Sequence, residues 1–250
     1  DAFYMAIFDV DRIVRMDMDA EKDGIMTVVF LEEVVNDYHG SGKNKDGETV
    51  PHRYGCSGID GTAFGPLFGQ PDSGNYLYVA YGIYSDLNRE DNDHQVLLCY
   101  DVSNWKDYAG PFNQKNLHRK GPKKPFQKLF LDTGNTTFGV QNLEYDALVG
   151  GFWMAVYPGK KPEYPNYELF LADAGKEPVF GKLRGIDEEG LKISLKPDMP
   201  GWRFPFGSTG LYASGDGTYL ISEPHTAESG KCSYIYEYCY CEGVPFVLKG

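Results

Sequence analysis

The residues best suited to chemistry in this chain are a carboxylate and an imidazole on either side of a proline, Glu223-Pro224-His225. A residue before proline favours extended backbone, so the sequence predicts that Glu223 ends a strand and that Pro224 starts a loop. Glycoside hydrolysis needs two carboxylates, about 5–5.5 Å apart for retention or about 6.5–9.5 Å for inversion. Asp9 and Asp86 are the candidate catalytic partners of Glu223. The favoured alternative is that Glu223 only forms an ion pair, with Arg203 or Arg53.

Several other side chains could bind a small ligand. An arginine can hold a carboxylate or phosphate with two hydrogen bonds, although in so acidic a chain an ion pair with Asp or Glu is the favoured role. Trp202 offers a flat apolar face to a sugar ring, or simply packs between neighbouring units. The polar Ser57, Gln141 and Thr209 occupy corresponding positions of a repeated motif, where they either contact ligand or satisfy the backbone. The candidate ligand-binding residues are Arg53, Ser57, Gln141, Tyr157, Trp202, Arg203, Thr209 and His225.

Metal binding has weaker support in the sequence. The acidic segment Asp86–Asp93 could hold calcium with its oxygen ligands, but its spacing matches no known calcium loop and a solvated charged loop is favoured. Residues 17–24 fail as an EF-hand loop, because the glycine is at position 8 rather than 6. Cys232, Cys239 and Cys241 lack paired C-x₂-C spacing, so buried structural thiols are expected in place of a metal site. We therefore expect no cofactor, with calcium as the alternative.

The elements that would position these side chains begin with a motif that occurs three times. Its form is an aromatic residue, Gly, two variable residues, a small residue or Asn, and then Ile or Leu. The copies are Tyr54–Ile59, Phe138–Leu143 and Phe206–Leu211. Four strand-like runs follow from each copy, separated by turn signals such as Asp72-Ser73-Gly74-Asn75. The run Tyr76–Tyr84 is almost entirely apolar or aromatic, which predicts a strand buried on both faces.

This arrangement resembles β-propeller proteins as a structural class, in which four-stranded antiparallel blades repeat around a channel. The sequence thus predicts an all-β chain that is one domain over residues 1–250. It has blades at about 54–132, 138–196 and 206–250. An N-terminal partial blade at 1–50 has strands at 3–8, 12–16 and 26–31. A β-sandwich is the alternative fold, but it does not explain the repeated motif. In propellers the loops at one end surround the channel mouth, and the resemblance implies that the candidate site residues gather there.

Composition limits the function further. The formal net charge is −12, so neither nucleic acid nor an anionic membrane surface is an expected partner. No apolar run is long enough to span a membrane, and none of the common nucleophile, phosphate-loop or zinc-helix motifs is present. The leading hypothesis is that a carbohydrate or similar small ligand binds in the channel mouth. A glycan hydrolase and a protein-interaction scaffold are the alternatives. A secreted, periplasmic or cell-surface location is expected, although the odd cysteine count of 5 argues against a complete disulfide framework.

Overall fold

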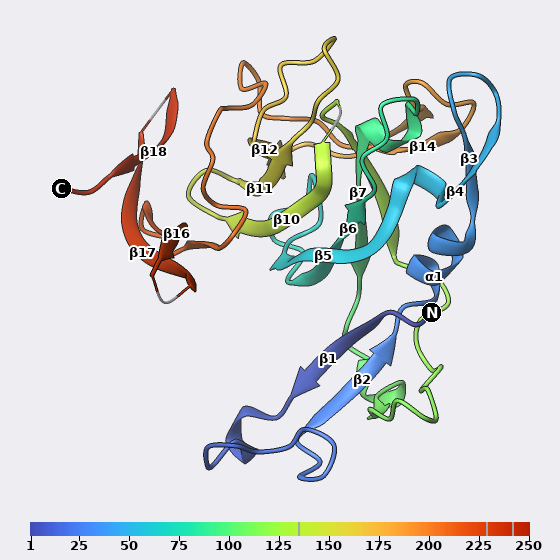
Figure 1. The fold of residues 1–250 in the computed structure, drawn as a ribbon, viewed down its shortest axis with the longest axis vertical. Helices are drawn as coiled ribbons and strands as arrows, with labels where there is room; N and C mark the ends of the chain where they lie inside the picture. Colours follow the sequence, from blue (N-terminus) through green and yellow to red (C-terminus); the bar gives the residue numbers. More distant parts are fainter. Residues whose placement is uncertain (135, 229, 242) are drawn as a thin grey trace.

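The protein is built mainly of β-strands, and its computed structural model describes residues 1–134, 136–228, 230–241 and 243–250. The strands form a large curled sheet, two smaller sheets of three and four strands, and one short hairpin (Figure 1). The all-β class predicted from the sequence is confirmed. Within the described residues, no helix has both the length and the hydropathy needed to cross a membrane.

The nine-stranded sheet holds most of the core. Its strands are β5 (Cys56–Gly65), β6 (Tyr76–Ile83), β7 (His94–Tyr100), β9 (Gln127–Asp132), β10 (Thr136–Asp146), β11 (Gly151–Pro158), β12 (Leu169–Asp173), β13 (Val179–Lys182) and β14 (Glu189–Lys192). The first predicted unit is present as the antiparallel series β5-β6-β7-β9. Along β6 and β7, successive side chains enter two different hydrophobic clusters, one on each face of the sheet. The prediction of a strand buried on both faces is therefore confirmed for β6.

The repeated motif encodes an unusual backbone turn at the start of β5 and β10. Tyr54 and Gly55 have φ angles of 56° and 69°, and Phe138 and Gly139 have 65° and 76°. Both turns lead into strands that pair with the end of β6, at Ile83. A left-handed aromatic residue is strained, whereas glycine takes this conformation freely, so the glycine is the part of the motif that the turn requires.

The C-terminal sheet has the four-stranded order predicted for the third unit. Its strands are β15 (Leu211–Ala213), β16 (Thr218–Ala227), β17 (Gly230–Cys241) and β18 (Val244–Leu248). Its inner face packs on the central sheet through Trp153, whose ring centroid lies 4.8 Å from that of Phe246. The two sheets therefore share one hydrophobic cluster.

The N-terminal region departs from the predicted partial blade. The first and third predicted strands exist as β1 (Tyr4–Phe8) and β2 (Met26–Phe30), but the prediction of a strand at 12–16 is wrong. That segment begins at the end of the short helix η1 (Val10–Arg12) and is exposed, and no strand among the described residues pairs with it. The third strand of this sheet is β8 (Gly110–Pro111), which comes from the long loop after β7. A helix, α1 (Glu32–His39), follows β2 and buries Val34 and Asp37.

The separation into independent blades is not confirmed. Strands of the first and second predicted units share the nine-stranded sheet, because β10 pairs with β6. The segment predicted as the last strand of the second unit contributes β14, which pairs in parallel with β9 and antiparallel with β13. Among the described residues, that segment is joined to β12 by an isolated bridge between Ala172 and Leu195. The remaining elements are the hairpin β3 (Ser41–Lys43) and β4 (Thr49–Pro51), and the short helices η2 (Arg53–Gly55), η3 (Asp91–Asp93) and η4 (Trp105–Asp107).

Candidate functional site

The candidate site is built around a strained turn between β4 and β5. His52 and Tyr54 both have positive φ angles, 65° and 56°, which non-glycine residues rarely adopt. The Arg89 guanidinium donates hydrogen bonds of 2.6 Å to the carbonyls of Pro51 and His52. The backbone N–H of Tyr54 donates to the Asp91 carboxylate over 3.0 Å. A buried ion pair thus holds this turn in a conformation that its own residues disfavour.

The solvated charged loop favoured for Asp86–Asp93 is found only in part, because Leu87, Asn88 and Glu90 are exposed whereas Arg89 and residues 91–93 are buried. Asp91 and Asp93 are buried, and each carboxylate is paired with a cation. Arg89 binds Asp91 over 2.8 Å, while Lys161 reaches Asp93 over 2.6 Å from the loop after β11. Burying a carboxylate is costly unless a charge compensates it, and both arrangements provide that charge.

Two side chains of the strained turn, Arg53 and Tyr54, belong to a cluster of charged and phenolic groups. Arg53 binds Glu188 over 2.7 Å, and the Tyr54 hydroxyl donates to the same carboxylate over 2.6 Å. Lys128 of β9 forms an ion pair with Asp37 of α1, and its Nζ atom lies 4.9 Å from the centroid of the Tyr54 ring. The cluster therefore brings together α1, the turn before β5, β9 and the loop before β14.

The environment shifts the pKa values of this cluster in opposite directions. Burial raises the pKa of the Asp37 carboxyl, although Lys128 and the Tyr81 hydroxyl act against it. Burial also tends to raise the pKa of Glu188, but hydrogen bonds from Arg53 and Tyr54 outweigh it, so this pKa lies below its ordinary value. Burial and the neighbouring Glu188 carboxylate raise the pKa of the Tyr54 hydroxyl. Glu188 therefore remains an anion and hydrogen-bond acceptor at neutral pH, with Tyr54 as a neutral donor.

This cluster lines a pocket of about 400 Å³, here called the Tyr54 pocket. Its polar side is formed by Glu33, Arg53, Lys128 and Glu188, together with the Tyr54 hydroxyl. Its other side includes two aromatic rings that are largely exposed, Phe126 with 58% and Phe180 with 65% of its surface accessible. The pocket thus combines ionic hydrogen-bonding groups with exposed aromatic surface.

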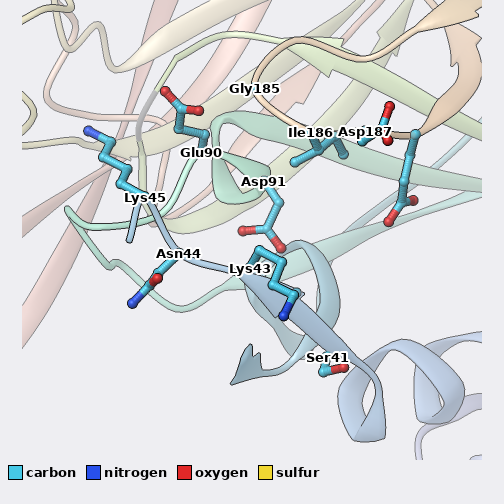
Figure 2. Close-up of a pocket in the computed structure, with 11 residues that line it drawn as sticks. Ser41, Lys43, Asn44, Lys45, Glu90, Asp91, Gly185, Ile186 and Asp187 are labelled. Carbon is cyan, nitrogen blue, oxygen red and sulfur yellow. The ribbon is translucent and has the colours of Figure 1, made fainter. Parts of the chain in front are cut away.

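A second pocket, of about 380 Å³, adjoins the Tyr54 pocket and is called the hairpin pocket. Figure 2 shows that Lys43, Asn44 and Lys45 of the β3–β4 hairpin approach it from one side and that acidic residues line the other. These acidic residues are Glu90, Asp91, Asp187 and Glu188. Glu188 lines both pockets.

Of the sequence-predicted ligand residues, only Arg53 lines the Tyr54 pocket. Ser57 and Gln141 lie at the first strands of their units, where Gln141 donates to Asp60 over 2.7 Å. Tyr157 is exposed near the end of β11 and contacts Phe138 edge to face. None of these three residues lines the Tyr54 pocket.

The other four predicted ligand residues belong to the region around the C-terminal sheet. Trp202 packs beside Trp153 with ring centroids 5.7 Å apart, as the packing alternative expected. Arg203 donates to the carbonyl of Pro165 over 2.9 Å, and Thr209 is exposed. His225 lies on β16, where its ring contacts Tyr234 edge to face. The structure does not bring these residues together with Arg53.

The three candidate catalytic carboxylates lie in different parts of the fold. Asp9 is exposed after β1, Asp86 lies in the loop between β6 and β7, and Glu223 lies in the C-terminal sheet. The prediction that Glu223 ends a strand is wrong, because β16 continues through Pro224 to Ala227 and pairs with β17. The partner of Glu223 is the Tyr238 hydroxyl, which donates to its carboxylate. We therefore do not propose hydrolysis through these three residues.

The cysteines also differ in part from expectation. Cys56 and Cys99 are buried thiols, whereas Cys232 and Cys241 are exposed and Cys239 is half-buried. Burial raises the pKa of Cys56 and of Cys99 to about 12, so both remain protonated at neutral pH. Among the described residues, no group of three or more His, Cys, Asp or Glu side chains is arranged to hold a metal ion.

Sequence reasoning missed Lys128, Glu188 and the exposed Phe126 and Phe180. Glu188 stands in the acidic run Asp187-Glu188-Glu189, which resembles any solvated turn, and its partner Arg53 is 135 positions away in the chain. The sequence feature that did point to this pocket is Arg53, which stands directly before the first motif copy. Comparisons of this chain with protein-family models, with curated proteins and with solved structures find no match.

Proposed function

We propose that this protein binds a carbohydrate or a similar polyhydroxylated small ligand in the Tyr54 pocket. The observation that supports this most is the presence of two exposed aromatic rings, Phe126 and Phe180, in the same pocket as the Arg53–Glu188 ion pair. Large apolar rings left open to solvent beside fixed hydrogen-bonding groups are typical of binding sites.

The chemistry of the pocket fits a sugar ring. The C–H face of a pyranose is apolar and packs on an aromatic ring, while its hydroxyl groups both donate and accept hydrogen bonds. Glu188 accepts, and Arg53 and Lys128 donate. Charged groups form stronger hydrogen bonds than neutral ones, and here they are held in position by one another before any ligand arrives. Adjacent hydroxyls could therefore be bound without reorganising the site.

We also propose that the repeated units are the blades of a β-propeller. The support is that the first strands of successive units are neighbours. A Cβ added to Gly61 of β5 would lie 3.0 Å from the backbone N of Leu143 in β10. Between the second and third units, the Asn142 side chain donates to the carbonyl of Gly207 over 2.6 Å, and Ala213 N–H donates to Glu144 over 3.0 Å. Innermost strands of consecutive blades are expected to lie side by side in this way.

A ligand screen tests the binding proposal. A glycan array and a thermal-shift screen of sugars and sugar acids should identify a ligand, whose affinity is then measured by calorimetry. Phe180→Ala should weaken that affinity about fivefold to tenfold, because it removes one aromatic face. The matched control is Val179→Ala, since Val179 is the exposed neighbour on β13 and does not line the pocket. Equal effects of the two substitutions, or no ligand across the screen, would contradict the proposal.

A further inference from the structure

A third pocket is larger than the Tyr54 pocket and the hairpin pocket, shares no lining residue with either, and has a different chemistry. It encloses about 630 Å³ between the β1–β2 hairpin and the central sheet, and is here called the hydrophobic pocket. This volume is in the range of small-molecule sites. Figure 1 shows the β1–β2 hairpin leaning away from β5 and β6, with the loop after β7 near it. The lining residues are Met5, Ala6, Ile7, Phe8, Thr27, Phe64, Leu77, Val102, Ser103, Trp105, Lys106 and Ala109.

The lining of this pocket leaves large apolar side chains exposed to water. Ile7, Phe8 and Phe64 are exposed in spite of their size. Three large apolar side chains around one cavity leave a contiguous hydrophobic surface, which soluble proteins usually cover with a ligand or a partner. The pocket therefore favours an occupant whose body is hydrocarbon.

One residue of the lining differs from the rest, and it limits the choice of occupant. Lys106 is the single charged residue of the lining, and it has no ion pair within the described part of the chain. Its neighbour Trp105 also lines the pocket and is buried, and its indole N–H has no hydrogen-bond acceptor among the described residues. Buried donors are nearly always satisfied in folded proteins. The indole N–H is covered by protein atoms, so the exposed Lys106 is the group of this lining that suits an anionic head group.

We infer that the hydrophobic pocket is a second ligand site, which takes a single-chain amphiphile with a carboxylate head, such as a medium-chain fatty acid. The hydrocarbon chain would contact Ile7, Phe8 and Phe64, and the carboxylate would lie toward Lys106. This site does not depend on the proposed carbohydrate function, because the two pockets share no lining residue.

Three ten-carbon probes that differ only in their head group test the inference on the full chain. Decanoate, 1-decanol and decyltrimethylammonium are each titrated below their micelle concentrations, and binding is followed by calorimetry and by tryptophan fluorescence. We expect decanoate to bind most tightly and the cationic probe least. Binding of decanoate should change the tryptophan fluorescence of the native chain but not that of the Trp105→Phe variant, because Trp105 lines the pocket.

Two variants and one control variant complete the test. Lys106→Glu should weaken decanoate about tenfold and leave decanol unchanged, whereas Lys115→Glu, the same charge change at an exposed lysine outside the lining, should have little effect. Ala6→Trp fills the pocket from an exposed position and should abolish binding of both probes with no loss of thermal stability. Equal affinity for all three head groups would overturn the inference. Binding to phosphatidylglycerol vesicles but to none of the three probes would also overturn it. The same holds if no probe binds and the chain instead self-associates in a way that Ala6→Trp abolishes.

Discussion

Single residues in this protein show how far a local charge pattern depends on distant partners. The acidic segment that includes Asp91 and Asp93 has the composition of an exposed loop, yet the structure buries both carboxylates. The charge that permits this comes from Arg89 within the loop and from Lys161, which is 68 positions from Asp93. Burial of charge is tolerated only with a partner, so the position of Lys161 decides the conformation of the loop.

The side chain of this lysine is only 1% exposed. Lys161→Met should lower the free energy of unfolding by about 3–5 kcal/mol, because it leaves the Asp93 carboxylate buried without its main partner. Urea unfolding followed by circular dichroism measures this. Adding Asp93→Asn should restore part of the loss, since the uncompensated charge is then removed. The exposed Lys123→Met is the control and should change stability by less than about 0.5 kcal/mol.

At the scale of elements, the repeated motif sets where strands begin. Each of the first two copies places an aromatic residue and a glycine in the left-handed region and then starts a strand against Ile83. The third copy keeps only part of this conformation, since Gly207 has a φ of 70° while Phe206 is not among the residues with positive φ. The glycine is thus the element of the motif that all three copies use in the same way.

Gly139→Ala tests this role. The substitution meets a φ of 76° and puts a Cβ atom 2.5 Å from the carbonyl oxygen of Tyr81. We expect a loss of roughly 3 kcal/mol, from left-handed strain of about 1–2 kcal/mol and the clash with β6. Gly74 has a φ of 84°, and a Cβ atom added there would have no atom within 4 Å, so Gly74→Ala should show the cost of the backbone strain alone. Equal losses in the two variants, measured by urea unfolding, would mean that the contact with β6 contributes nothing.

The sequence predicted elements better than it predicted their partners. Runs such as Tyr76–Tyr84 gave the strands and the order of the first and third units, because apolar β-branched and aromatic residues between turn signals are a local property. The helix α1 was missed, since its N-cap Leu31 makes no side-chain cap hydrogen bond and the helix is only 8 residues long. The site was mostly missed for a related reason. Arg53 stood next to a motif, but contacts such as Arg53–Glu188 join distant segments and leave no periodic signal.

At the scale of the whole molecule, the C-terminal sheet is joined to the central sheet by aromatic packing. Trp153 of β11 is fully buried, and its ring lies against Trp202, Tyr219, Tyr240 and Phe246. The Tyr219 hydroxyl and the Trp153 indole N–H both donate to Asp146 of β10. Trp153 of the central sheet thus packs into the hydrophobic core of the C-terminal sheet.

Trp153→Ala should therefore destabilise both sheets together. We expect a loss of about 3–5 kcal/mol, the usual cost of removing a large buried side chain. Hydrogen exchange read by mass spectrometry should show faster exchange in β11 and in β16 to a similar extent. Tyr157→Ala, an exposed aromatic residue on the same strand, is the control. Faster exchange confined to β16 and β17 would mean that the C-terminal sheet unfolds on its own.

The position of Glu188 in both the Tyr54 pocket and the hairpin pocket has a thermodynamic consequence. A molecule in the hairpin pocket that moves or neutralises this carboxylate also changes the ion-pair partner of Arg53 in the Tyr54 pocket. Occupation of the two pockets is then linked, and linkage is reciprocal. Whatever factor an occupant of the hairpin pocket applies to affinity in the Tyr54 pocket, an occupant of the Tyr54 pocket must apply in return. Through Glu188, two ligands that do not touch each other can therefore bind with positive or negative cooperativity.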